Sequence, residues 1–152
     1  MKGEGIMITK EQSINKYCCL YVSDFHLEMI LLPFIKNKIK ESEILIFTQN
    51  SLLETLHTLL KKLNLSNENK NRIIDIKNWN TEKIDLINNE DVKEYTVIIN
   101  GNKEYRDRIN KKIEKFNINV KNIVDCYDVN NTSIKSNYIQ NNYIGVLNTE
   151  GI

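Results

Sequence analysis

YCCLYVSDFHLEMILLPFIKNKIKESEILIFT, residues 17–48, holds the pattern that decides the fold of this 152-residue chain. Its first six residues, Tyr17–Val22, form a continuous apolar run, which is typical of a strand buried on both faces. A helical pattern follows from Asp24, which we expect to cap the helix. The apolar positions of this helix recur at spacings of three and four: Leu27, Ile30, Leu31, Phe34, Ile35 and Ile39. Pro33 should kink this helix or end its first half. EILIFT (Glu43–Thr48) then predicts a second strand.

The alternation of strands and helices continues along the chain. Ser51-Leu52-Leu53-Glu54 has the form of a capping box and predicts a second helix. Further strands are expected at Arg72–Ile76, Tyr95–Ile99, Val120–Tyr127 and Tyr143–Leu147. A third helix should carry Tyr105, Ile109, Ile113 and Phe116 on one face, and short helices fit residues 80–94 and the segment around Ile134 and Tyr138.

This order predicts a three-layer α/β fold of the RecA/Rossmann-like kind. Its mostly parallel sheet should have about five to six strands, joined by right-handed connections, with helices on both faces. Residues 1–16 are polar and predict an N-terminal arm, and residues 17–152 predict a single α/β domain.

Charge and composition exclude several classes of protein. The chain has 21 Lys+Arg and 20 Asp+Glu, so it lacks the positive charge that direct nucleic-acid binding or a polybasic membrane surface requires. Without a signal peptide or an apolar stretch approaching about 20 residues, we expect a cytoplasmic protein with no membrane partner. Cys18, Cys19 and Cys126 fit buried small hydrophobes. The chain has no CxxC, and Asp125 and Asp128 are weak evidence for a cation, so we expect no metal or other cofactor.

Ligands of open α/β sheets bind beyond the carboxyl ends of the strands. That rule selects the candidate ligand-binding residues Asp24, His26, Gln49, Trp79, Asn100, Arg106 and Asp128. Arg106 is the best anion clamp, because its guanidinium is a planar fork. Structural alternatives remain open: Asp24 also suits a helix cap, as do Asn50, Ser51 and Asn102, and Trp79 suits a lid on the core. His26 should be a neutral hydrogen-bonding group, since the helix dipole in a first turn disfavours imidazolium.

The sequence lacks several motifs that bind phosphates or carry out catalysis. The junction between the first strand and first helix, VSDFHLEMIL, has no Gly and no Lys. A phosphate-binding loop would need GxxxxGK[ST] there, and a dinucleotide fold would need GxGxxG, so that backbone amides can approach phosphates. The chain also has no GxSxG or HExxH motif. These absences favour a protein that is not an enzyme.

Most of residues 16–148 resembles the MEDS domains, the sensory modules of methanogen proteins and DcmR-type regulators. The matching residues are Leu20-Tyr21, Asp24, Glu28, Pro33-Phe34, Glu43, Glu54, Leu60 and Asp75, and the later matching segments are Val97–Asn102, Asp125–Asp128 and Tyr143–Leu147. MEDS domains are similar to RecA/KaiC-type ATPase cores without the phosphate loop, so the resemblance implies a RecA-like sensory fold. Two positions depart from the family: Lys16-Tyr17 stands where a His is frequent, and Lys36–Ile39 replaces a glycine.

We therefore expect a non-catalytic sensory or regulatory module, in signalling or transcriptional control, that binds a small ligand or a partner protein. One alternative is an enzyme that handles nucleotides or phosphate esters through an atypical loop. Another is an assembly subunit, including self-association, whose interface is the 100–116 helix or the Ile134–Leu147 stretch. In that case Tyr138, Tyr143 and Ile144 are either interface anchors or core residues.

Overall fold

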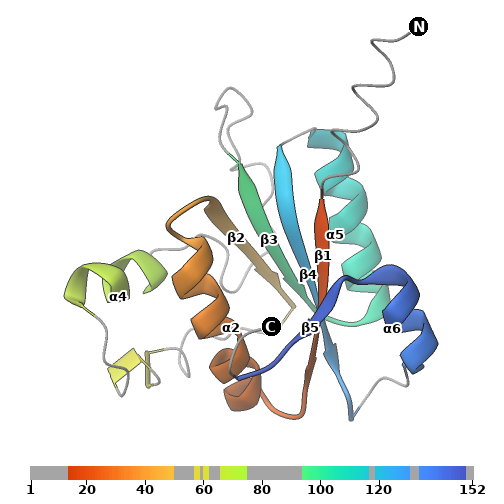
Figure 1. The fold of residues 1–152 in the computed structure, drawn as a ribbon, viewed down its shortest axis with the longest axis horizontal. Helices are drawn as coiled ribbons and strands as arrows, with labels where there is room; N and C mark the ends of the chain where they lie inside the picture. Colours follow the sequence, from red (N-terminus) through yellow and green to blue (C-terminus); the bar gives the residue numbers. More distant parts are fainter. Residues whose placement is uncertain are drawn as a thin grey trace, which may run out of the picture.

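The computed structural model describes residues 14–49, 57–58, 60–61, 66–74, 94–116, 119–130 and 134–149. A five-stranded, all-parallel sheet forms its centre, with the strand order β2-β3-β4-β1-β5. The strands are β1 (Asn15–Tyr21), β2 (Glu43–Thr48), β3 (Tyr95–Asn100), β4 (Val120–Asp128) and β5 (Gly145–Leu147). The helices are α2 (Asp24–Lys38), α4 (Asn67–Ile74), α5 (Lys103–Phe116) and α6 (Ser136–Asn142) (Figure 1). The predicted three-layer α/β fold is confirmed.

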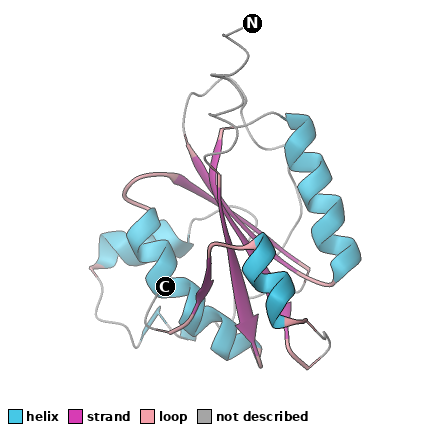
Figure 2. Cartoon of the chain, turned by 45° about the vertical axis from the view of Figure 1, so that its right-hand side comes forward, coloured by secondary structure: helices cyan, strands magenta, loops and turns pink. Residues whose placement is uncertain are grey.

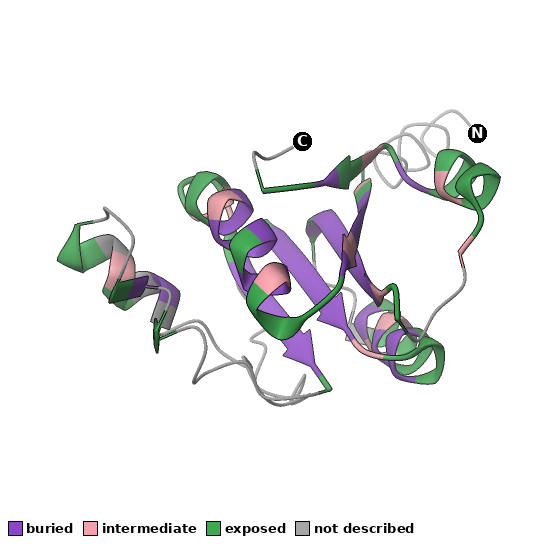
Figure 3. Cartoon of the chain, turned by 90° about the horizontal axis from the view of Figure 1, so that it is seen from below, coloured by how far each residue is buried: buried purple, intermediate pink, exposed green. Residues whose placement is uncertain are grey.

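Helices cover both faces of the sheet. Because successive side chains of a strand point to opposite faces, each strand supplies two cores. On one face α2 packs on a cluster that includes Tyr17, Cys19, Ile46, Ile98 and Val124. On the other face α5 packs on Leu45, Phe47, Val97, Ile99 and Ile123. Figure 2 shows α5 and α6 on the same side of the sheet, and Figure 3 shows buried residues along the strands and the sheet-facing sides of α2 and α5.

The start of α2 differs from the prediction. Ser23, not Asp24, is the N-cap: its backbone is extended and its Oγ accepts a hydrogen bond from His26 N at 3.1 Å. The helix also runs through Pro33 to Lys38, so the expectation that Pro33 ends its first half is wrong. Proline inside a helix costs about 3 kcal/mol. Leu31 and Ile35, on either side of it, are fully buried, and each contributes roughly 1.5–3 kcal/mol.

The strand predicted at Arg72–Ile76 is wrong over its described part, because residues 72–74 end α4. Ile73 is buried in the α2-face core, and a short apolar run cannot by itself distinguish a strand from a buried helix. The last strand begins at Gly145 rather than Tyr143, and β1 begins at Asn15, inside the predicted arm. The capping box Ser51–Glu54, Trp79 and residues 80–93 lie outside the described residues, as does the arm up to residue 13.

The strand order determines where a site can form. β1 lies beside β4, and their residues pair from Asn15↔Asn122 to Tyr21↔Asp128. β1 leads into α2 on one face, whereas β4 leads into α6 on the other. Adjacent parallel strands whose connections leave on opposite faces form a topological switch point, where open α/β sheets bind ligands.

Replacing Ile98 by alanine should lower the free energy of unfolding by about 2–5 kcal/mol, because the side chain, on the interior strand β3, is completely buried in the core beneath α2. Ile144→Ala is the matched control: Ile144 is 64% exposed, and its loss should change the free energy by less than about 0.5 kcal/mol. Urea unfolding measures both. Equal effects would contradict this placement of the core.

Candidate functional site

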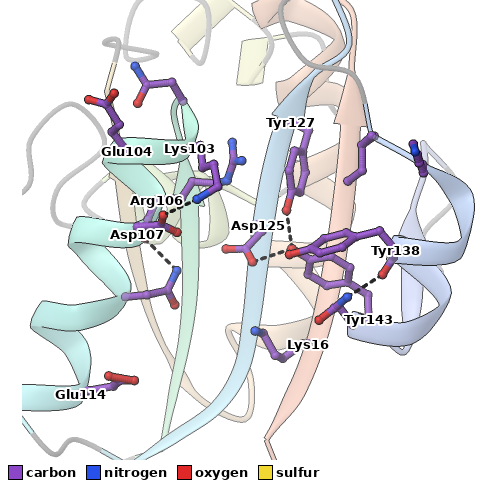
Figure 4. A pocket seen from close by; sticks show the side chains of 15 residues that line it. Lys16, Lys103, Glu104, Arg106, Asp107, Glu114, Asp125, Tyr127, Tyr138 and Tyr143 are labelled. Atoms are coloured by element: carbon purple, nitrogen blue, oxygen red, sulfur yellow. Dashed lines mark hydrogen bonds and ion pairs between the residues drawn. The ribbon is translucent and has the colours of Figure 1, made fainter.

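A groove of about 940 Å³ lies between α5 and α6, over the face of β4 and β1. Asp125 and Tyr127 reach it from β4, and Tyr143 reaches it from the segment between α6 and β5 (Figure 4). Lys103, Arg106 and Asp107 of α5 line one wall, and Tyr138 of α6 lines the other. We call this the α5–α6 groove.

Three side chains at the floor of the groove form a directed hydrogen-bond chain. The Tyr143 hydroxyl donates to Asp125 Oδ2 at 2.8 Å. A tyrosine hydroxyl has one proton, and that of Tyr143 is already given to Asp125. Tyr127 must therefore be the donor in the 2.6 Å hydrogen bond between the Tyr127 and Tyr143 hydroxyls. The chain therefore runs from Tyr127 through Tyr143 to Asp125.

The second oxygen of Asp125 is the unusual feature of the floor. The side chain is only 5% exposed, and among the described residues Asp125 Oδ1 has no hydrogen-bond donor. Leaving a buried acceptor unpaired costs about 1–3 kcal/mol, and more when the group is charged. Asp125 lines the groove, so its floor contains a buried carboxylate oxygen without a donor among the described residues.

Arg106 closes the upper part of the groove. Its guanidinium lies 3.9 Å from the centroid of the Tyr127 ring, and its Nη1 donates to Gly101 O at 2.6 Å. Gly101 is suited to this turn, since a Cβ there would lie 2.4 Å from the Tyr105 ring. Of the described residues that we predicted to bind a ligand, Arg106 lines the groove, and part of its donor capacity is already used.

The charges that line the groove balance. The cationic residues are Lys16, Lys103, Arg106 and Lys135, and the acidic residues are Glu104, Asp107, Glu114 and Asp125. Lys103 and Asp107 form an exposed ion pair at 2.9 Å. A lining without net charge offers little attraction to a polyphosphate.

The first helix and its junction hold two of the other predicted residues. His26 Nδ1 accepts a hydrogen bond from Val22 N at 3.0 Å, so the side chain makes a hydrogen bond as the sequence predicted. Asp24 is exposed in the first turn of α2, where its charge complements the helix dipole. Neither residue reaches the α5–α6 groove.

The remaining candidates tie elements together. Gln49 Oε1 accepts from Asn102 N at 2.9 Å, and the buried Asn100 Oδ1 accepts from the Tyr21 hydroxyl at 2.7 Å. Asp128 Oδ1 accepts from Asn130 N, in the turn after β4. Asn102 caps α5, as expected, by accepting from Tyr105 N, and Trp79 lies outside the described residues.

As a chemical group, the floor residue Asp125 was predicted only as half of a weak cation-binding pair with Asp128. The two side chains are three residues apart on β4, so they point to opposite faces of the sheet. In the described part of the chain, no three His, Cys, Asp or Glu side chains gather to hold a metal ion. A sequence signal for Asp125 did exist: it is an acidic residue inside the apolar run IVDCY, where charged side chains are rare unless paired.

Burial controls the ionisation of the groups under the groove. It raises the pKa of the Cys18 thiol to about 12, and it also raises the pKa of Tyr127. The pKa of Tyr143 is raised by burial first and by the Asp125 carboxylate second. All three groups therefore keep their protons at neutral pH.

The free energy of unfolding should fall as the pH rises from about 9 toward 12. The folded pKa of Cys18 lies above its ordinary value of 9.0, so its contribution is complete below pH 9 and is lost as the unfolded thiol ionises. Cys18→Ala should give a shallower decline over this range, because it removes one such group. Urea unfolding at several pH values tests this, and parallel curves for the two proteins would contradict it.

Compared with protein-family models, with curated proteins and with solved structures, the chain matches none. Among the residues with a described structure, no helix is long and apolar enough to cross a bilayer. The functional argument therefore depends on the groove itself.

Proposed function

We propose that this chain is a non-catalytic sensory or regulatory module that binds a small polar ligand in the α5–α6 groove. The observation that carries the proposal is the buried Asp125 carboxylate, which lines a groove of about 940 Å³ and whose Oδ1 lacks a donor among the described residues. Small-molecule sites commonly have volumes of about 300–1,000 Å³ and a few polar groups that orient the ligand.

The protonation states in the groove favour binding over catalysis. Cys18, Tyr127 and Tyr143 all have raised pKa values, so they are poor nucleophiles and poor bases at neutral pH. Arg106 is stacked on Tyr127 and bonded to Gly101. These groups present a fixed set of donors and acceptors, as a binding site requires.

The β1–α2 junction supports the same conclusion. A phosphate loop offers free backbone amides at this place. Here Val22 N donates to His26 Nδ1, His26 N donates to Ser23 Oγ, and Leu27 N donates to Ser23 O. Amides that are already satisfied by neighbouring side chains and carbonyls argue against the alternative of a nucleotide-handling enzyme.

Hydrogen bonds connect the floor of the groove to α6 and β1. Tyr143 contributes its hydroxyl to the floor, its backbone N donates to Ile139 O at the end of α6, and the next residue, Ile144, donates to Lys16 O of β1. A ligand on Asp125 would therefore act on the segment that joins α6 to β5. A change in this segment on ligand binding could transmit a signal to a partner protein, as expected of a MEDS-like sensory module.

A screen of metabolites and nucleotides should find a compound that raises the melting temperature of the full chain. The rise should disappear in Asn110→Trp, because Asn110 lines the groove and the indole would fill it. Asn37→Trp is the control, since Asn37 is an exposed residue of α2 on the other face. If no compound raises the melting temperature, or if the rise persists in Asn110→Trp, the proposed function is wrong.

Self-assembly is a second candidate, favoured by the exposed apolar side chains on β5 and before it. Ile144 and Val146 are exposed, and so is Tyr138, whereas Tyr143 is a core residue. β5 is an edge strand of the described sheet, and open strand edges can pair with another chain.

Light scattering over a range of concentrations should show a mass above that of the 17.9 kDa monomer if β5 mediates assembly. Val146→Lys should restore the monomer, because a lysine on an edge strand disfavours pairing with a second copy. Lys103→Ala, a change in an exposed residue at the start of α5, should leave the mass unchanged. A monomer at every concentration would exclude this candidate.

A further inference from the structure

We infer that the ligand of the α5–α6 groove carries a protonated amino group, which binds Asp125. This inference rests on the proposed function, because it takes the groove to be a ligand site. It adds the chemical class of the ligand, which follows from the direction of the hydrogen bonds at the floor.

The floor of the groove presents acceptors. Asp125 Oδ1 is a carboxylate oxygen without a donor among the described residues. The Tyr127 hydroxyl gives its proton to Tyr143, because Tyr143 gives its own proton to Asp125. Tyr127 therefore offers lone pairs to a ligand. A carboxylate or phosphate would meet these lone pairs with lone pairs of its own, whereas an ammonium group brings three donors.

Aromatic rings surround this floor. The Tyr143 ring lies 6.3 Å from the Tyr127 ring and 6.4 Å from the Tyr138 ring, measured between centroids, and both contacts are edge-to-face. Cations are attracted to the faces of such rings. Two of these rings already contact cationic side chains of the protein itself: Arg106 lies over Tyr127, and Lys16 Nζ lies 5.8 Å from the centre of the Tyr143 ring.

The balanced lining limits the net charge of the ligand. Four cationic and four acidic residues face the groove, so neither a polyphosphate nor a polyamine is favoured overall. Asp125 is the buried acid of this set, while Asp107 is already paired with Lys103 at the rim. The amino group of the ligand would therefore bind at the floor of the groove, at Asp125.

Three probes of similar shape test the inference: benzylamine, benzyl alcohol and benzoate, titrated at pH 7 into the isotope-labelled full chain and followed by NMR. Benzylamine should shift the resonances of groove residues and bind about tenfold or more tightly than either of the others, because a charge-assisted hydrogen bond is worth at least that factor. If benzoate or benzyl alcohol binds as tightly as benzylamine, the inference is overturned.

Asp125→Asn gives the sharper test. The amide keeps an acceptor for Tyr143 and turns the free acceptor into a donor, so benzylamine should lose about tenfold or more of its affinity. Asp24→Asn is the matched control, since Asp24 is exposed in the first turn of α2 and does not line the groove. Unchanged binding of benzylamine by Asp125→Asn would overturn the inference. If Asp125→Asn does not fold, the ranking of the three probes on the unmodified chain decides the question.

The two proposals fail in different ways. If the screen yields a ligand that Asn110→Trp excludes, but that ligand has no amino group and benzylamine does not bind, the amine inference is wrong and the proposed function stands. If neither the screened compounds nor the probes reach the groove, both are wrong.

Discussion

Asp125 is a carboxylate within a strand that is covered on both faces, and the surrounding groups satisfy one of its two oxygens. Tyr143 donates to one oxygen and is oriented in turn by Tyr127. The same Tyr143 ends α6 through its backbone N, and Ile144 N donates to Lys16 O. A single acid at the centre of β4 is thereby connected to the C-terminal helix and to β1. Buried polar groups specify an arrangement in this way because any other arrangement would leave more of them unpaired.

The parallel sheet explains why this polar centre lies on the α5–α6 face. Apolar side chains of α2 cover the opposite face, where Tyr17, Leu31 and Ile98 belong to one core. On the other face, α5 covers β2 and β3 with Tyr105, Ile109 and Ile113. The seven-residue α6 has no buried residue of its own and packs near Cys18 and Tyr127 mainly through Ile139. The groove occupies the space between the long helix α5 and the short helix α6.

Patterns that depend on neighbours in sequence were predictable, and those that depend on pairing across the sheet were not. The segments 17–22, 43–48, 95–99 and 120–127 are rich in apolar residues, as strands buried on both faces are, and they predicted four strands. The strand predicted from Arg72 was wrong, because an apolar side chain such as Ile73 fits a buried helix as well as a buried strand. Arg106 was predicted from its place after β3. The role of Asp125 requires knowing that Tyr143, 18 residues later, returns to the same face, which no local pattern contains.

A groove that holds a carboxylate oxygen without a donor among the described residues makes the free protein less stable than its packing would allow. A ligand that supplies the missing donor recovers this free energy, so binding and the stability of the α6–β5 segment are linked. If a ligand binds there as we propose, the occupied and the empty groove should differ most at Tyr143, whose hydroxyl bonds to Asp125 and whose backbone N bonds to Ile139 O at the end of α6. An enzyme could use such a buried acid to move a proton, but Tyr127 and Tyr143 beside it keep their protons at neutral pH, because burial raises the pKa of both. On this basis we propose that the groove detects a ligand and does not convert it.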